Sequence, residues 1–537
     1  MITQVLGAAV EVLDTVPDDV AARTPAVPAA DGGLDRLFTP LEGMLCDLDT
    51  TEFPWTVQIE ARVAGRLDVD AVRSAVVAAL VRHPMGFARR APHGPLDAAY
   101  RWEQAAGLDV DPVVEVMATS DADHAALRDL VLSSRICVDV APLVRAWVMH
   151  RPGGDSLVLA VSHVLADGLG ALRLLRSVAA ALAGRDDGVD PVSLDEALRW
   201  VGPTTLIDRA VSLGGFALAN PVQRTPVSRI AVAAGDASTS GAGRTGPAVR
   251  RGRRRRREGR SGFRLHELVV DAAGLSSPPR RRHDERPACR RPAPGDRGPQ
   301  RRPRHRDGPH QVMMPVNLRP APWRDEVVVN LASMATVSTG VAERETPGSL
   351  LDAVARQTRR VKRTGSPRAL DVVLAGGGPL PVGLKRFLPM LLPLTGDRLV
   401  DTAVLSNLGR TDPVDFGPEV GPAVELWFSP PARMPLGVGI GAATVDDRLH
   451  LSFRSCGAQF DDAAARGFRR DLPPGARVPR LTKPSRSRCG NRWLRQLTTR
   501  TWALRSGGGA VDDGAAEGWN SLGPVRGARC HRRRRRR

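Results

Sequence analysis

Positive charge concentrates in two segments of this chain, and that concentration limits how much of it can form a packed core. The 537 residues carry a net charge of +19, but residues 241–310 contribute +14 and residues 471–537 contribute +13, which leaves −8 for the remainder. Both segments consist largely of Arg, Pro and Gly, so they bury too little apolar surface to offset the entropy lost on ordering. We therefore expect two foldable blocks, interrupted by a disordered basic middle segment at 236–310 and followed by a disordered basic tail at 468–537.

The coding sequence offers an explanation for these segments. Only three of the 77 basic residues are lysines, a bias that suggests a GC-rich gene. Codons for residues 282–287, read one nucleotide later, can spell Ala-Thr-Thr-Asn-Asp. We interpret 236–310 as largely an out-of-frame reading, in which the short apolar run 263–270 could still dock as a strand or helix. A genuine basic linker that binds polyanions is the alternative.

The arginine runs at 253–257 and 532–537 also fit a nucleic-acid-binding protein, in which they would contact phosphates. No aromatic side chains are interleaved with these runs, and the rest of the chain is acidic. The sequence therefore argues against a specific nucleic-acid partner.

The cysteines and the apolar runs indicate the compartment. Six cysteines are scattered without a CxxC pair or a metal-ligand spacing, so we expect free thiols in a reducing compartment and no metal. No apolar run is long enough to span a membrane, and residues 1–34 read as a loose leader without the pattern of a secretion signal. We expect a cytoplasmic protein, for which peripheral contact with a membrane or lipid surface stays open.

Apolar periodicity divides the foldable part into an N-terminal block, 35–235, and a C-terminal block, 311–467. Asp68 or Asp70 can cap the first helix, and the turn residues 152–154 make a hairpin of the strands that flank them. The predicted strands are 57–63, 143–149, 156–161, 327–339, 402–408, 436–443 and 449–453, and the predicted helices are 68–83, 169–182 and 350–361. The pattern predicts two α/β lobes.

One predicted strand ends in residues that can carry chemistry. His163 follows strand 156–161, and Asp167 and Gly168 come directly before helix 169–182. A neutral imidazole at a strand end that faces a cleft can take a proton from an attacking alcohol or amine. Asp167 can pair with an arginine and brace the loop. Gly168 allows a backbone conformation closed to other residues and a close approach of the helix. The alternative is an ordinary histidine at a strand end.

The segment Ser162-His163-Val164-Leu165-Ala166-Asp167-Gly168 resembles the HHxxxDG signature of two families. These are the condensation domains of peptide synthetases and the wax ester synthase/diacylglycerol acyltransferase family. The resemblance implies two chloramphenicol-acetyltransferase-like lobes with an active-site channel between them, and His163 as catalytic base. Ser162 stands where those families usually have a first histidine, which puts the substrate type in doubt more than the activity.

Further segments carry the same resemblance, which covers about 37–235 and 311–467. Pro315-Val316-Asn317-Leu318-Arg319 is similar to a segment of the second lobe and makes Arg319 the candidate partner of Asp167. Val329-Asn330 is similar to a Gly-Asn segment that precedes a strand. Ser406-Asn407-Leu408-Gly409 is similar to a strand end near the acyl site, and Asp415-Phe416-Gly417 loosely resembles a structural motif of plant relatives. Ser162, Ser406 and Asn407 are accordingly candidates to line the acyl site. A plain surface arginine at 319 and a turn-capping role for Asn407 stay open as alternatives.

The activity that the resemblance implies is transfer of an acyl group from acyl-CoA, or from an acyl carrier protein, to an alcohol. It requires no cofactor beyond that thioester co-substrate and forms no covalent acyl-enzyme. Two alternatives stay open: amide or ester formation of the condensation-domain kind in secondary metabolism, and an inactive, frameshifted copy.

Overall fold

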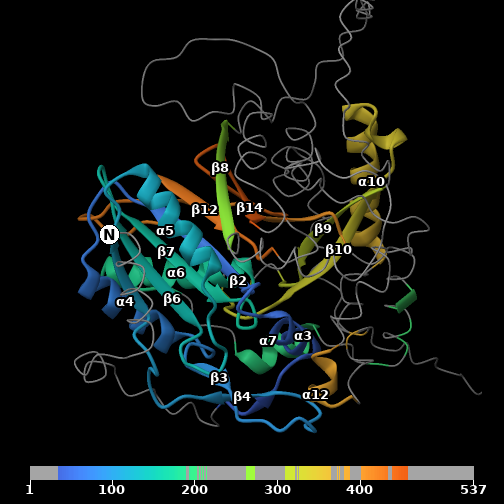
Figure 1. Cartoon of the computed structure of the whole chain (residues 1–537), viewed down its shortest axis with the longest axis horizontal. Helices are drawn as coiled ribbons and strands as arrows, with labels where there is room; N and C mark the ends of the chain where they lie inside the picture. The colour runs from blue at the N-terminus through green and yellow to red at the C-terminus, as the bar shows by residue number, and fades with distance from the viewer. Residues whose placement is uncertain are drawn as a thin grey trace, which may run out of the picture.

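The computed structural model describes residues 34–188, 193–201, 262–271, 309–320, 326–364, 380–387, 401–432 and 438–457, together with single positions between these ranges. Within them the chain forms the predicted α/β structure, arranged as three sheets flanked by helices (Figure 1). The leader, most of the basic middle segment and the tail lie outside the described residues. The predictions of disorder, of an out-of-frame reading and of nucleic-acid binding concern those residues and stay predictions.

A five-stranded sheet forms the frame of the N-terminal lobe, in the order β12-β2-β7-β6-β5. Its strands are β2 Thr56–Arg62, β5 Val113–Met117, β6 Val144–His150, β7 Ser156–Ser162 and β12 Glu425–Ser429. The three strands predicted in this lobe are confirmed to within one residue. β6 and β7 form the predicted antiparallel hairpin, in which Gly153 and Gly154 adopt φ angles of +84° and +122° that favour glycine.

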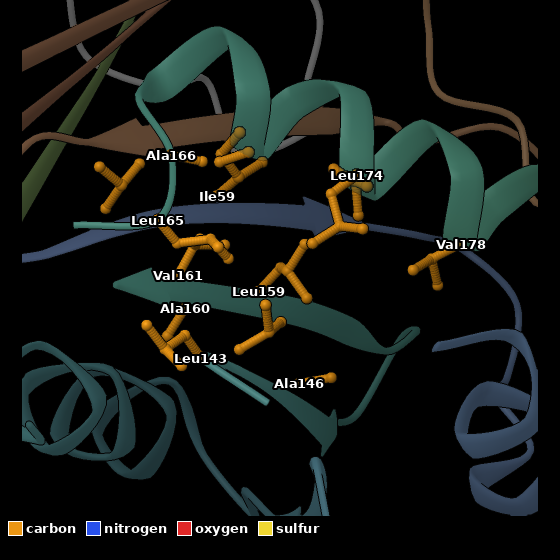
Figure 2. Packing of buried hydrophobic residues seen from close by; sticks show 14 of the residues in the cluster. Ile59, Leu143, Ala146, Leu159, Ala160, Val161, Leu165, Ala166, Leu174 and Val178 are labelled. Carbon is orange, nitrogen blue, oxygen red and sulfur yellow. The ribbon is translucent and has the colours of Figure 1, made fainter. Parts of the chain in front are cut away.

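Helices cover this sheet because each has an apolar stripe. α4 (Val69–Arg82) begins at Asp68, whose side chain accepts the backbone N–H of Ala71, as the sequence predicts. α6 (Gly168–Leu182) buries Leu172, Leu174, Leu175 and Val178, and Figure 2 shows Leu174 and Val178 on the side of α6 that faces the sheet. Each fully buried leucine contributes about 1.5–3 kcal/mol. The remaining helices of this lobe are α3 Pro40–Leu48, α5 Asp121–Ser133 and α7 Leu194–Val201.

A six-stranded sheet forms the second lobe, in the order β10-β9-β11-β13-β14-β8. Its strands are β8 Phe263–Asp271, β9 His310–Asn317, β10 Ala332–Thr339, β11 Ala403–Arg410, β13 Val438–Val445 and β14 Arg448–Cys456. The strand or helix expected near 263–270 is confirmed as β8, which pairs with β14 along its whole length. The predicted helix 350–361 lies within α10 (Pro347–Thr364). The remaining elements are a small sheet of β1 Arg36–Leu37, β3 Ala88–Arg90 and β4 Arg101–Gln104, a 3-10 turn at Ala342–Arg344, and α12 Val382–Lys385.

The predicted strand 327–339 is too long, since β10 begins only at Ala332. Most of the backbone hydrogen bonds of the preceding residues go to side chains, although the Leu331 carbonyl still accepts the N–H of Leu318 at 2.9 Å. The carbonyls of Val327 and Val329 accept hydrogen bonds from Arg319, and the N–H of Leu331 donates to Asp167. Apolar periodicity cannot reveal this, because the side chains of 327–329 and 331 are buried just as those of a strand would be.

β12 joins the two lobes. It lies between residues of the C-terminal block in sequence, yet it pairs with β2 as the edge strand of the N-terminal sheet. The Phe428 carbonyl of β12 accepts a hydrogen bond from Ser452 of β14. The same carbonyl oxygen lies so close to Gly441 of β13 that there is no room for a β-carbon. The largest core cluster of the described residues accordingly includes Leu426 and Phe428 of β12 with residues of both blocks.

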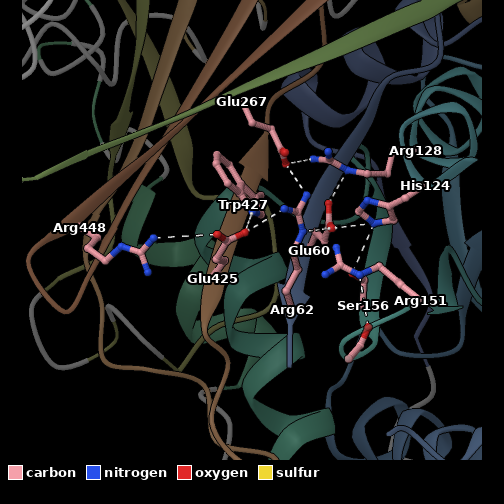
Figure 3. Close-up of polar contacts among 11 residues, drawn as sticks. Glu60, Arg62, His124, Arg128, Arg151, Ser156, Glu267, Glu425, Trp427 and Arg448 are labelled. Atoms are coloured by element: carbon pink, nitrogen blue, oxygen red, sulfur yellow. Dashed lines mark hydrogen bonds and ion pairs between the residues drawn. The ribbon is translucent and has the colours of Figure 1, made fainter. Parts of the chain in front are cut away.

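A buried group of charges fastens β8 and β12 to β2 (Figure 3). Arg62 donates to Glu60 of its own strand at 2.7 Å, to Glu267 of β8 at 2.7 Å and to Glu425 of β12 at 2.8 Å. Arg128 of α5 pairs with Glu60 and Glu267 as well. Buried charges are tolerated when each has partners of opposite sign, as these do. Three separate parts of the chain therefore meet at one guanidinium.

Gly441→Ala tests the contact between β12 and β13. A β-carbon at Gly441 would lie 1.7 Å from the Phe428 carbonyl oxygen, a backbone atom that cannot move without displacing the strand. We expect a loss of about 1–3 kcal/mol in the free energy of unfolding, measured by urea denaturation.

Gly43→Ala is the matched control, because a β-carbon at Gly43 in α3 would meet nothing within 4 Å. Alanine there should leave stability unchanged or raise it by about 0.5–1 kcal/mol. Equal midpoints for the two variants would contradict the close contact of β12 with β13.

Candidate active site

A cavity lies between the lobes, at the end of β7, and encloses about 880 Å³ of space that is partly open to solvent. Apolar side chains make up most of its wall. From the N-terminal block come Leu41, Leu45, Trp55, Val57, His163, Asp167, Gly168 and Leu169, and from the C-terminal block come Met313, Pro315, Asn317, Arg319, Asn330, Ala332, Ser333, Met334, Val404, Ser406, Asn407, Leu408, Phe428, Pro430 and Pro431. Its position agrees with the predicted interlobe channel.

His163 follows the last residue of β7 and lines this cavity. Its backbone N–H donates to the Trp55 carbonyl at 2.8 Å, and its own carbonyl accepts from the Asn330 side chain at 2.8 Å. The imidazole Nδ1 lies 3.1 Å from the Ala166 carbonyl oxygen. Both ends of the residue are therefore fixed, one by each lobe.

Two groups contact the imidazole Nδ1. The Ala166 carbonyl at 3.1 Å can only accept and favours a proton on Nδ1, which leaves the lone pair of a neutral ring on Nε2. The Asn330 amide nitrogen lies farther away, at 3.4 Å, and could donate only to an unprotonated Nδ1. Burial lowers the pKa of His163 because it disfavours the imidazolium, while the Asp167 carboxylate acts in the opposite direction. Burial therefore favours the neutral ring.

Asp167 is held by four hydrogen bonds. Its carboxylate forms a bidentate pair with Arg319, at 2.7 and 2.9 Å, and accepts the backbone N–H groups of Gly170 at 2.9 Å and Leu331 at 3.0 Å. The Gly170 bond makes Asp167 the N-cap of α6. The predicted pairing with Arg319 is observed, and the Arg319 side chain is 0% exposed, so this is not a surface arginine.

The charge of Asp167 is stabilised by the same contacts. Burial by itself would raise the pKa of Asp167, but the Arg319 guanidinium and the two backbone N–H groups hold it below its ordinary value. Each carboxylate oxygen accepts two hydrogen bonds, so Asp167 braces the loop between His163 and α6. Arg319 extends the brace to the Val327 and Val329 carbonyls of the other lobe.

Of the two reasons expected for Gly168, one is confirmed and one is wrong. Gly168 is the first residue of α6 and does not have a positive φ, so no backbone conformation closed to other residues is needed. The expected close approach is confirmed. A β-carbon there would lie 2.7 Å from the Phe428 ring and 3.0 Å from Leu408.

The three residues expected to line an acyl site separate into two groups. Ser406 and Asn407 lie on the cavity wall. The Asn407 side-chain oxygen also accepts the N–H of Gly409 at 2.8 Å, which supports the turn-capping role. Ser162 is not among the lining residues. It is buried in β7, where its carbonyl accepts the N–H groups of Leu165 and Ala166 and shapes the turn after His163.

Two residues near His163 carried little signal in the sequence. The Trp55 indole is nearly parallel to the His163 ring, with 16° between the planes and 6.5 Å between centroids. Asn330, noted only as part of a resembling dipeptide, holds the His163 carbonyl from the other lobe. Both contacts bridge distant parts of the chain, so no local pattern marks them. In the described part of the chain, no group of His, Cys, Asp and Glu side chains is arranged to hold a metal ion.

No family model matches the chain. It is 32% identical over 445 residues to "Uncharacterized protein Rv2305" of Mycobacterium tuberculosis (strain ATCC 25618 / H37Rv), an alignment that covers 80% of this chain and 96% of that protein. The same values hold for "Uncharacterized protein MT2362" of strain CDC 1551 / Oshkosh.

Solved structures resemble this one at low sequence identity. The starter condensation domain of rhizomide synthetase, a mutant in complex with C8-CoA and Leu-SNAC, matches with a TM-score of 0.52 at 11% identity, over 82% of this chain and 92% of that one. The trichothecene 15-O-acetyltransferase of Fusarium sporotrichioides matches with a TM-score of 0.51 at 10% identity, over 85% of this chain and 97% of that one. At these identities the likeness concerns the fold, and it confirms the predicted two-lobed class. The chain therefore belongs to the family of the two mycobacterial proteins, and it has the fold that condensation domains share with this acetyltransferase.

Proposed function

We propose that this chain is an O-acyltransferase that moves an acyl group from an acyl-CoA or acyl carrier protein thioester to an alcohol, with His163 as general base. The observation that carries the proposal is the imidazole at the wall of the interlobe cavity, with Nδ1 fixed on the Ala166 carbonyl. One structure with the same fold is a condensation domain in complex with C8-CoA, and another is a trichothecene 15-O-acetyltransferase. The site described above suits the same class of reaction.

The proposed step needs only the base and the two substrates. The alcohol oxygen attacks the thioester carbonyl carbon while His163 Nε2 takes its proton. The tetrahedral intermediate then collapses, the carbon–sulfur bond breaks, and the imidazolium returns the proton to the departing thiolate. The ester and a free thiol are the products. Among the described residues no hydroxyl or thiol is hydrogen-bonded to His163, which favours direct transfer over a covalent acyl-enzyme.

The wall of the cavity favours apolar substrates. Leucine, valine, methionine, proline and aromatic side chains form most of it, and the polar groups other than the Asp167–Arg319 pair are His163, Ser333, Ser406 and three asparagines. A low dielectric there strengthens the contact of Nε2 with the attacking hydroxyl. A donor and acceptor of the kind used by wax ester synthases and diacylglycerol acyltransferases would fit such a wall.

Amide formation of the condensation-domain kind uses the same base and is the second candidate. Among the described helices none is long and apolar enough to cross a membrane, and peripheral contact with a lipid surface is part of the same proposal.

His163→Ala tests the base. With octanoyl-CoA as donor and dodecan-1-ol as acceptor, we expect release of free thiol by the full chain, and a fall of about 10²–10⁴-fold in kcat for the variant. His83→Ala is the matched control, because His83 is also buried but contacts Ser177 and does not line the cavity. It should lose stability and keep kcat per folded molecule.

A His163→Ala enzyme whose kcat stays within threefold of the parent would exclude His163 as the base. No thiol release by the parent with any donor from acetyl-CoA to palmitoyl-CoA would favour the inactive copy.

The pH dependence of kcat/KM provides an independent test. The base must be neutral, so activity falls as pH drops through the pKa of His163 in the free enzyme. Because burial lowers that pKa from its ordinary 6.5, the acid limb should have its midpoint below 6.5. A midpoint above 6.5 would assign the limb to another group.

Asp167→Asn separates bracing from chemistry. Removing one charge leaves the fully buried Arg319 without its counterion, so we expect a loss of about 3–5 kcal/mol in stability. Asp415→Asn is the control, because the Asp415–Arg185 pair is exposed and its loss should change the urea midpoint little. A stable Asp167→Asn protein with a large loss of kcat would mean that Asp167 acts directly in the reaction.

A further inference from the structure

Arg454 is a buried cation with an unusual set of partners. It lies near the end of β14, and its side chain is 0% exposed. The guanidinium donates to three backbone carbonyls, those of Thr56 at 3.1 Å, Pro54 at 3.4 Å and Leu132 at 2.7 Å. It also lies 4.3 Å from the centroid of the Phe263 ring. Burial lowers the pKa of Arg454 to about 9, so the group keeps its charge at neutral pH.

These partners, which include no carboxylate, explain how the charge is tolerated. Leu132 is in the last turn of α5, where carbonyl groups have no partner within the helix and the helix dipole is negative. No basic residue of α5 itself occupies that turn. The Phe263 ring adds a cation–π contact. Arg454 therefore supplies, from the other lobe, the cation that the end of α5 lacks.

The other two carbonyls lead to the active site. In an extended segment successive carbonyls point in opposite directions. Pro54 and Thr56 direct theirs to Arg454, and the carbonyl between them, that of Trp55, accepts the backbone N–H of His163 at 2.8 Å. The Trp55 ring also stacks on the His163 ring. The backbone N–H of Trp55 donates to the buried Asp49 carboxylate at 2.8 Å. Arg454 and His163 thus lie on opposite edges of one short segment.

Within the described residues, this segment has no strand on the side of Arg454. β12 pairs with β2 only from Gln58 to Arg62 and ends before Thr56 is reached. The guanidinium takes the place of the missing strand, since its planar fork can bind neighbouring carbonyls together. Without Arg454, residues 54–56 would keep their hydrogen bonds to His163 and Asp49, but the carbonyls of Pro54 and Thr56 on the opposite edge would lose their donor.

We propose that Arg454 is a positioning residue, which fixes the backbone of 54–56 and thereby the location of His163 at the cavity. The inference rests on His163 being the base of the proposed function. Arg454 is not among the residues that line the cavity, so it should act on the placement of the base and not on substrate binding.

Arg454→Met and Arg454→Lys test this role in the full chain. Methionine keeps much of the volume and removes every donor, whereas lysine keeps the charge but cannot reproduce the fork. We expect kcat with octanoyl-CoA and dodecan-1-ol to fall about 10–100-fold for Met and several-fold for Lys, with KM for octanoyl-CoA unchanged within about twofold.

Arg145→Met is the matched control. Arg145 is also a buried arginine that donates to backbone carbonyls, those of Pro142 and Val144 in and before β6, and it does not line the cavity. This variant should lose stability and retain kcat per folded molecule. If Arg145→Met lowers kcat as much as Arg454→Met does, the effect is general destabilisation and the proposal is wrong.

A measurement without substrate separates this inference from the proposed function. The NMR signal of the His163 ring Cε1–H, identified by its loss in His163→Ala, should shift in both Arg454 variants and stay in place in Arg145→Met. Should Arg454→Met fail to fold, the lysine variant decides, and an unchanged ring signal with unchanged kcat would overturn the positioning role. If His163→Ala retains full activity, the proposed function fails, whatever the ring signal does.

Discussion

The buried ion pair of Asp167 and Arg319 is the contact on which the site depends. One carboxylate caps α6, accepts the N–H of Leu331 and pairs with a guanidinium that also binds the carbonyls of Val327 and Val329. The ion pair thereby joins the start of α6 in one lobe to an irregular segment of the other. It does so through four backbone groups: the N–H groups of Gly170 and Leu331 and the carbonyls of Val327 and Val329. The His163 loop lies between α6 and this segment, because His163 and Asp167 are separated by a single turn. Such a pair contributes little net stability over apolar packing, but breaking it is costly, so it favours one arrangement of the lobes.

Two further sets of contacts join the lobes. β12 leaves the C-terminal block to become an edge strand of the N-terminal sheet, and Arg62 binds it to β8 through Glu425 and Glu267. Arg454 reaches in the opposite direction, from β14 to the segment before β2. Each set uses a charged side chain that is shielded from water and given several partners. His163 is therefore held by residues that lie far apart in the chain.

Local patterns in the sequence predicted the elements that follow local rules. The strand of His163, the helix after Gly168 and the Asp68 cap depend on neighbouring residues, and they lie within one or two residues of their expected positions. The pairing of Asp167 with Arg319 was accessible only through a resemblance, since 152 positions separate the two residues. Non-local contacts account for the errors. The strand expected at 327–331 is absent because Arg319 and Asp167 bind backbone groups of this segment. Ser162 does not line the cavity, whose walls no periodicity could locate.

The protonation state of His163 at rest is the property from which the proposed chemistry follows. Long-range ¹H–¹⁵N NMR of the histidine rings reads it directly, with the His163 signals assigned from the His163→Ala spectrum. At neutral pH the contact with the Ala166 carbonyl predicts a neutral ring protonated on Nδ1, with the ¹⁵N shift of an unprotonated nitrogen at Nε2. A ring protonated on Nε2, or on both nitrogens, would leave Nε2 without a lone pair and would contradict the proposed role of His163 as base.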